Sequence, residues 1–204
     1  MTKRKYLTQQ EVALLLEQAK QTQFAARNHC LVYMGFVHGL RVSELLGLRL
    51  SDMDLHGRTL YVRRLKNGFS TSHPLLAQEV KIIRAWLRER KQFRGAETTD
   101  WLFLSRTGGP LTRQQFYNII RKLGGKTEIS VCSHPHMLRH ACGYALADRG
   151  VDTRLIQDYL GHRNIRHTVR YTASNAARFE DVWRMKVRRS GGLFGPKCPL
   201  ALST

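Results

Sequence analysis

The chain has 204 residues, 42% of them hydrophobic, which is the length and composition of one globular domain with its own core. No apolar run approaches the roughly 20 residues that span a membrane. Lys and Arg number 34 against 15 acids, and the resulting formal charge of +19 indicates a polyanionic partner, with nucleic acid the first candidate and an anionic membrane surface the second.

Helices are predicted over most of the first 48 residues. Thr8 and Glu11 have the spacing of a capping box, and helical periodicity follows them. A second predicted helix covers residues 25–38 and ends at Gly39, and a short third one covers residues 42–48. These apolar faces predict a core made of packed helices.

The hydrophobic period then changes from helical to alternating. Leu60 and Val62 lie on one face of the run 58–65, and Arg64 falls on the same face. Lys-Asn-Gly at residues 66–68 is a hairpin turn signal, so the sequence predicts a small β-hairpin or sheet here.

Helical patterns return in the second half of the chain. They cover residues 77–93, 116–123, 136–149, 153–160, 165–171 and 175–187. Thr112 begins a capping box, Pro135 stands at a helix start, and Gly161 at a helix end. A short buried run at 101–105 and a turn at 107–110 separate two of the helices. The predicted fold class is therefore mostly α with a small antiparallel β-sheet, an α+β fold without internal repeats.

The cysteines and the N-terminus indicate a cytoplasmic location. The four cysteines, none in a CxxC pair, are Cys30, Cys132, Cys142 and Cys198. We expect Cys30 and Cys142 to be buried thiols, because both lie inside apolar helical patterns. A reducing compartment fits this usage, and the N-terminal MTKRKYLTQQ lacks the apolar core of a signal peptide.

Several polar residues are not explained by these periodic patterns. They are Arg41, Lys66, His136, Arg139, His162 and Tyr171. Structural interpretations exist for some of them: Arg41 can pair with Glu44 at helical spacing, and Lys66 can be a solvated turn lysine. His162 can likewise be a helix C-cap donor, and Tyr171 a core aromatic.

His136, Arg139 and His140 fall at i, i+3 and i+4, on one face of the first turn of a helix. Two histidines at this spacing can bind zinc. The Glu of HExxH is absent, however, and Arg139 on the same face would repel a cation. Cationic donors at a helix N-terminus favour an anion such as phosphate. His140 is equally well explained as a packed histidine.

Tyr171 stands among basic residues, in GHRNIRHTVRYT. A tyrosine hydroxyl has a pKa of about 10 and is a poor nucleophile unless nearby cations favour its ionised form. Phosphoryl transfer needs charge on the non-bridging oxygens to be stabilised, which two arginines and a histidine can do without a metal. A lysine or a histidine can protonate the leaving oxygen. No P-loop, carboxylate pair or Ser-His-Asp pattern is present, and we expect neither metal nor cofactor.

In order and spacing these residues resemble the tyrosine recombinases, the phage integrase family. GLRVSELLGL is similar to the segment with the family's first arginine, at Arg41, and the β-turn lysine corresponds to Lys66. HPHMLRHACGYALADRG is similar to the His-x-x-Arg box, at His136 and Arg139. The final box, YLGHRNIRHTVRYT, completes a resemblance that covers about residues 5–185.

The resemblance implies cleavage of DNA through a 3′-phosphotyrosine, without ATP. Tyr171 is the implied nucleophile and Lys66 the general acid, while His136 assists proton transfer or orients the phosphate. The residues implied to hold the non-bridging oxygens are Arg41, Arg139 and His162. A non-catalytic DNA-binding regulator and a type IB topoisomerase-like enzyme remain as alternatives.

A closer resemblance is to the enterobacterial fimbrial phase-variation recombinases, the type 1 fimbriae regulatory and Proteus-type switch invertases. FSTSHPLL, FLSRTGGPLTRQQFY and DTRLIQDYLGHRNIRHTVRYTASNAARF carry it. It implies inversion of a promoter element between inverted repeats in double-stranded DNA. The implied setting is a homotetramer at the bacterial nucleoid, with accessory DNA-bending proteins and no membrane partner.

The closer resemblance also sets the expected domain organisation. The chain begins almost at the catalytic domain, as this branch does, so we expect one catalytic domain over residues 1–187, no separate N-terminal core-binding domain, and a flexible tail over 188–204. The apolar stripe of helix 175–187 either docks on the next protomer or packs on its own domain. Base-reading residues are sought in the basic helical stretches 84–90 and 113–122, where solvated faces are an equal explanation.

Overall fold

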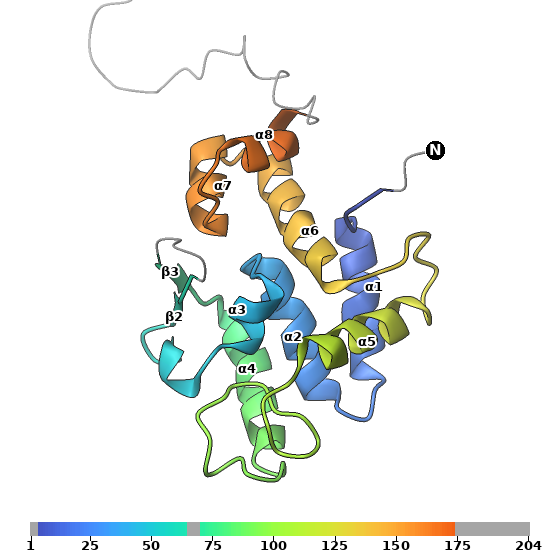
Figure 1. Ribbon diagram of the computed structural model, residues 1–204, viewed down its shortest axis with the longest axis vertical. Coiled ribbons are helices and arrows are strands. Elements are labelled where there is room, and N and C mark those ends of the chain that lie inside the picture. Colours follow the sequence, from blue (N-terminus) through green and yellow to red (C-terminus); the bar gives the residue numbers. More distant parts are fainter. Residues whose placement is uncertain (1–3, 65–69, 174–204) are drawn as a thin grey trace, which may run out of the picture.

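The structure is a computed structural model that describes residues 4–64 and 70–173 (Figure 1). The described elements are mostly helices with one small sheet. In chain order they are α1 (Gln9–Lys20), α2 (Ala25–Val37), α3 (Val42–Leu46), the 3₁₀ turn η1 (Leu50–Asp52), β1 (Met53–Asp54), β2 (Thr59–Val62), β3 (Thr71–Pro74), α4 (Ala77–Arg90), α5 (Arg113–Gly124), α6 (Pro135–Asp148), α7 (Thr153–Leu160) and α8 (Arg166–Ala173). The α+β class predicted from the sequence is confirmed.

The helix starts follow the capping signals in the sequence. Thr8 Oγ1 accepts from the Glu11 N–H at 3.2 Å, and the Glu11 carboxylate accepts from the Thr8 N–H at 2.8 Å. Thr112 and Gln115 form the same reciprocal box at α5. Each box satisfies backbone donors that the first helical turn leaves unpaired.

The main core lies between α2 and the helices that surround it. α2 packs against α1, α4 and α6, and its buried face includes Leu31 and Met34. Trp86 of α4 stacks with Phe103, and its indole N–H donates to the Leu102 carbonyl at 3.0 Å. The predicted buried run 101–105 is therefore part of this core, and burying such aromatic rings contributes much of its stability.

The described strands form one antiparallel sheet in the order β1-β2-β3. Leu60 pairs with His73 and Val62 with Thr71. Leu60, Val62 and Arg64 are all buried, as their shared face predicts. The predicted turn at residues 66–68, with Lys66, lies outside the described residues.

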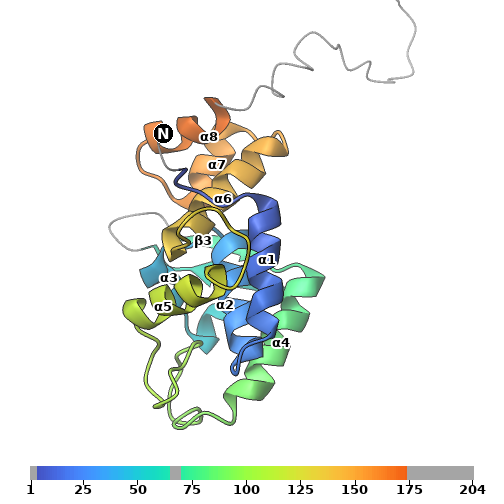
Figure 2. The same cartoon turned by 90° about the vertical axis from the view of Figure 1, so that its right-hand side faces the viewer.

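α7 and α8 form a second, smaller layer at the C-terminal end of α6, seen at the top of Figure 1 and again in Figure 2. Its core contains Cys142 of α6, Ile156 and Leu160 of α7, and Tyr171 of α8. α6 contacts both layers, since it packs against α2 in the main core and against α7 and α8 in the smaller one.

Among residues 4–64 and 70–173, no helix has the length and apolarity to cross a membrane. α4 ends at Arg90, three residues before the predicted end. Cys30 and Cys142 are buried thiols, as predicted. The predicted helix 175–187 and the tail 188–204 lie outside the described residues.

Candidate active site

Two of the predicted arginines meet at the C-terminal end of α7. Arg139, 2% exposed, donates to the Gly39 carbonyl at 2.5 Å and to the Leu160 carbonyl at 2.7 Å. Arg41 donates to the carbonyl of Gly161 at 3.3 Å. The last carbonyls of a helix have no helical partner and carry partial negative charge, so guanidinium groups satisfy them well.

A third guanidinium, which the sequence did not single out as functional, joins them. Arg64, two residues after β2, donates to the carbonyl of Tyr159 and, at 2.9 Å, to the Glu44 carboxylate. Arg64 is buried, and its Nε finds no hydrogen-bond partner among the described residues. Three positive side chains therefore lie on the three consecutive carbonyls that end α7.

Glu44 links two of these cations. Its Oε1 accepts from Arg41 at 2.6 Å, and its side chain is only 1% exposed. Burial acts to raise the pKa of Glu44, but the Arg41 N–H and the charges of Arg64 and Arg41 outweigh it, and the pKa is lowered. The predicted Arg41–Glu44 pair is thus present, and it orients an arginine that remains 35% exposed.

Arg139 keeps its charge although it is buried. Burial, reinforced by the neighbouring Arg41, lowers its pKa to about 10, which still leaves the guanidinium protonated at neutral pH. An arginine with fixed partners on two sides is pre-oriented toward an incoming anion.

His162 follows the helix end directly. Gly161 adopts the left-handed conformation with φ of 64°, which turns the chain out of α7 and places His162 beside α8. His162 Nδ1 lies 2.9 Å from Thr168 Oγ1, and its ring stacks on that of Tyr171 with centroids 6.2 Å apart. Burial and the charges of Arg139 and Arg41 lower its pKa to about 3, so the imidazole is neutral in the free protein.

Tyr171 is both a core aromatic and a site residue. It is 1% exposed and belongs to the small core between α6 and α8. Its hydroxyl lies 2.9 Å from His140 Nδ1 and 3.1 Å from a guanidinium nitrogen of Arg170. Its ring lies close to the Cα of Gly143, where a Cβ would come within 2.6 Å of Tyr171 Cε2. Gly143, which sequence patterns did not single out, makes the space that this tyrosine occupies.

His136 lies at the open side of the site. It is exposed, and its ring meets that of His140 edge-on, with centroids 4.4 Å apart. Although the residue is exposed, partial desolvation of its ring against the protein and the Arg139 charge lower its pKa. Within the described ranges, no group of three or more His, Cys, Asp or Glu side chains is placed to hold a metal ion.

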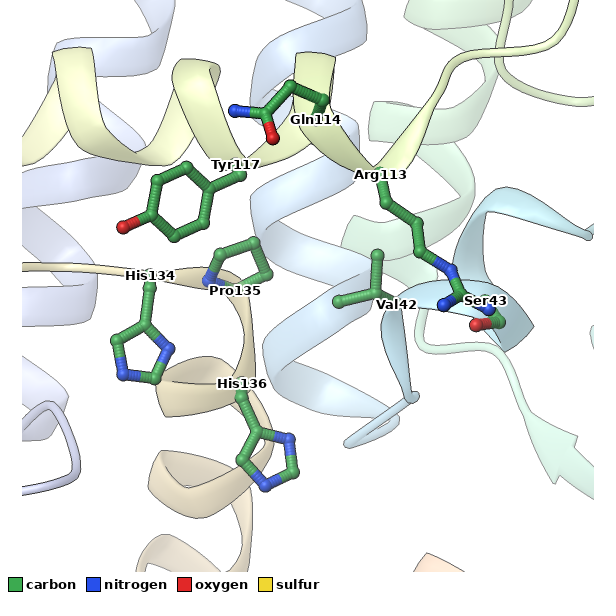
Figure 3. A pocket seen from close by; sticks show the side chains of 8 residues that line it. All are labelled: Val42, Ser43, Arg113, Gln114, Tyr117, His134, Pro135 and His136. Carbon is green, nitrogen blue, oxygen red and sulfur yellow. The ribbon is translucent and has the colours of Figure 1, made fainter.

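A cavity of about 360 Å³ opens beside His136, between α3, α5 and the start of α6. Figure 3 shows Tyr117 and Arg113 reaching into it from α5, with His134 and His136 on the opposite wall. Arg113 is one of the basic residues considered for base reading. Arg90, from the other candidate stretch, is buried, and its guanidinium holds the carbonyls of residues 96, 99 and 101.

The geometry of the site matches one class of chemistry. Arg41 and Arg139 lie together on the carbonyls at the end of α7, and His162 and Tyr171 lie on the segment that follows this helix, with their rings stacked. A tyrosine beside phosphate-binding cations is the arrangement of an enzyme that transfers a phosphoryl group through a phenolic oxygen.

Comparison with known proteins identifies the family. The model of the phage integrase family matches residues 5–178. The chain is 57% identical over 181 residues to the type 1 fimbriae regulatory protein FimB of Escherichia coli (strain K12), covering 89% of this chain and 90% of that protein. It is 55% identical over 183 residues to FimE of the same strain, covering 90% and 92%. The crystal structure of XerA recombinase is 28% identical with a TM-score of 0.75, covering 93% of this chain and 68% of that chain.

The chain belongs to the phage integrase family and is a tyrosine site-specific recombinase. The family resemblance drawn from four sequence motifs is confirmed over nearly the whole chain. The individual roles of the site residues remain predictions.

Proposed function

We propose that this recombinase inverts a DNA segment carrying a fimbrial promoter between two inverted repeats, and so switches fimbrial expression on and off. The extensive identity to two type 1 fimbriae regulatory proteins supports this reading. The observation that carries the chemistry is the convergence of Arg41 and Arg139 on the end of α7, from which His162 and Tyr171 follow.

Cleavage begins with attack of Tyr171 Oη on the scissile phosphorus. The Oη–P bond forms, the bond from phosphorus to the 5′-oxygen breaks, and a 3′-phosphotyrosine results. Arg41, Arg139 and His162 hold the non-bridging oxygens, where guanidinium geometry matches phosphate. Negative charge on these oxygens also favours the charged form of His162, whose pKa in the free protein is about 3.

The leaving 5′-oxygen requires a proton, and Lys66, which lies between β2 and β3 in the sequence, is the proposed donor. His136, exposed at the open side of the site, orients the phosphate or assists this transfer. A 5′-hydroxyl of the partner duplex then attacks the phosphotyrosine. The covalent intermediate retains the phosphodiester energy, so no ATP is needed.

Inversion joins two sites, and each duplex needs two protomers. We therefore include a cyclic homotetramer in the proposal, with the segment 175–187 of one protomer docking on the next. The charge of +19 supplies affinity through phosphate contacts that carry no sequence information. Accessory proteins that bend the DNA between the repeats complete the assembly, which acts on cytoplasmic, nucleoid DNA.

A covalent trapping assay tests the chemistry. The protein is mixed with a nicked suicide duplex bearing a fimbrial-switch inverted repeat, denatured, and run on a gel beside Tyr171→Phe. We expect an adduct with the wild type, none with Tyr171→Phe, and equal DNA binding by both. A duplex with a scrambled repeat should trap far less protein.

The outcomes separate the alternatives. Adducts of equal yield on repeat and scrambled DNA, with relaxation of supercoiled plasmid, would indicate a type IB topoisomerase-like enzyme. Tight binding without any adduct, on supercoiled DNA as well, would indicate a non-catalytic regulator. Inversion of a plasmid-borne switch by the wild type alone completes the test of the proposed function.

A further inference from the structure

The hydroxyl of Tyr171 has two polar neighbours that the mechanism above does not use. His140 Nδ1 lies 2.9 Å from it, and a terminal guanidinium nitrogen of Arg170 lies 3.1 Å from it. The same Arg170 nitrogen is 2.9 Å from His140 Nδ1, so the three atoms form a triangle. His140 is 9% exposed and comes from α6, whereas the other two residues are neighbours on α8.

The Arg170 nitrogen lies nearer to Nδ1 of His140, at 2.9 Å, than to Nε2, at 3.5 Å. A neutral imidazole carries its proton on one ring nitrogen and accepts at the other. The tautomer that can take a proton from Tyr171 has its own proton on Nε2 and its lone pair on Nδ1. With Nδ1 as the acceptor, the phenolic O–H of Tyr171 donates to His140, and its proton already points at a base.

The protonation state agrees with this orientation. Burial, and after it the charges of His136 and Arg170, lower the pKa of His140 to about 3. The ring is therefore neutral near pH 7. A bound phosphate opposes the cations that lower this pKa, and the phenol becomes far more acidic as its oxygen bonds to phosphorus. Proton transfer thus becomes favourable during the attack itself.

We propose that His140 is a catalytic residue of strand cleavage, which accepts the phenolic proton as Tyr171 attacks the phosphate. The O–H bond of the phenol breaks and an Nδ1–H bond forms, giving an imidazolium, while the Oη–P bond forms and the bond to the 5′-oxygen breaks. The leaving oxygen takes its proton from a separate donor, Lys66 in the proposed function on which this inference rests. Arg170 holds the phenolic oxygen while its charge develops. In strand rejoining the imidazolium returns its proton to Tyr171.

Substitution of His140 tests the proposal in single-turnover adduct formation on the suicide duplex. We expect His140→Ala to bind DNA normally and to form adduct at least about 100-fold more slowly, as for other removed general bases. Added imidazole should restore much of the rate, and substituted imidazoles should do so in the order of their basicity. His140→Gln keeps a hydrogen-bond acceptor that cannot take a proton, and it should remain slow.

His56→Gln is the matched control, because His56 is an exposed histidine in the turn before β2. It should cleave at the wild-type rate. A His140→Gln variant as fast as wild type would overturn the proposal and leave His140 as a positioning residue. A His140→Ala variant at the wild-type rate would overturn both roles.

A second measurement needs no variant and no cleavage. Nitrogen NMR of histidine-labelled wild-type protein should show His140 Nδ1 as the unprotonated ring nitrogen, and a protonated Nδ1 would overturn the proposal. If wild-type protein forms no adduct at all, the proposed function fails, whereas loss of the His140 effect with a normal wild-type adduct contradicts this inference alone.

Discussion

The ring of Tyr171 lies against the backbone of Gly143, so closely that a Cβ on Gly143 would come within 2.7 Å of three ring carbons. Gly143 is in the middle of α6, where glycine disfavours the helix by about 1 kcal/mol relative to alanine. The packed tyrosine explains why a glycine fits this position.

Gly143→Ala should therefore displace Tyr171, the proposed nucleophile. We expect it to slow adduct formation by at least 10-fold and to lower the free energy of unfolding by about 1–3 kcal/mol, because overpacking outweighs the gain in helix propensity. Suicide-duplex trapping and urea unfolding measure the two effects. Gly109→Ala is the control, since nothing lies within 4 Å of a Cβ built there. An unchanged cleavage rate in Gly143→Ala would mean that Tyr171 moves away from Gly143 before it reacts.

Glu44→Gln should destabilise the protein strongly. The substitution leaves the buried guanidinium of Arg64 without its charged partner, and breaking a buried pair in this way costs about 3–5 kcal/mol. Urea denaturation measures the change. Glu17→Gln breaks an exposed pair with Lys20 and should leave the midpoint nearly unchanged. Equal effects of the two substitutions would contradict the role of Glu44.

The pH dependence of stability should also reflect the lowered pKa of Glu44. The pKa of Glu44 in the folded protein lies below its usual value of 4.5, so the folded state binds its proton less readily than the unfolded state. Its contribution is present above pH 4.5 and is lost as the pH falls through that value toward the folded pKa. Urea midpoints should therefore fall less steeply in acid for Glu44→Gln than for wild type. Parallel plots of urea midpoint against pH for the two proteins would contradict this contribution of Glu44.

Lys66→Ala should slow cleavage of a normal phosphodiester by about 10²–10⁴-fold, as expected when a general acid is removed. A substrate with a sulfur in place of the 5′-bridging oxygen needs no such proton, and it should restore the rate. Single-turnover trapping on the two substrates measures this. Wild-type rates on the normal substrate would mean that another residue is the acid.

Arg90→Ala should lower the free energy of unfolding without changing the rate of DNA cleavage. The carbonyls of residues 96, 99 and 101 would lose their buried donor, at about 1–3 kcal/mol for each group left unpaired. Thermal unfolding should show the loss. Arg88→Ala, an exposed position on the same helix, should not. If Arg90→Ala instead changed sequence preference with no loss of stability, base reading by this residue would be restored as an explanation.

Local signals predicted much of the fold. The Thr8 and Thr112 capping boxes, Pro135 at the start of α6 and the left-handed Gly161 at the end of α7 are all recorded in a few adjacent residues. The end of α4 was missed because a tertiary contact decides it. Arg90 turns toward the carbonyls of the following loop, and the chain leaves the helix there.

The sequence singled out Arg41, Arg139, His162 and Tyr171, but it did not predict the contacts that bring them together. Arg64 is 20 residues from Glu44 and 95 from Tyr159, separations at which periodicity carries no information. One signal was available, because Arg64 shares the buried face of β2 with Leu60 and Val62. An arginine on an apolar face needs a buried acceptor, but only the fold tells which one.

Three guanidinium groups donate to the carbonyls at the end of α7, so the order of this helix end depends on the same side chains that form the site. Arg139 donates to the carbonyls of both Leu160 and Gly39, and the turn after α7 leads to α8, the helix that contains Tyr171. Loss of this arginine would remove a proposed phosphate ligand and, at the same time, the side chain that holds this turn. The release should be visible as faster amide hydrogen exchange across α8, before any DNA has been added.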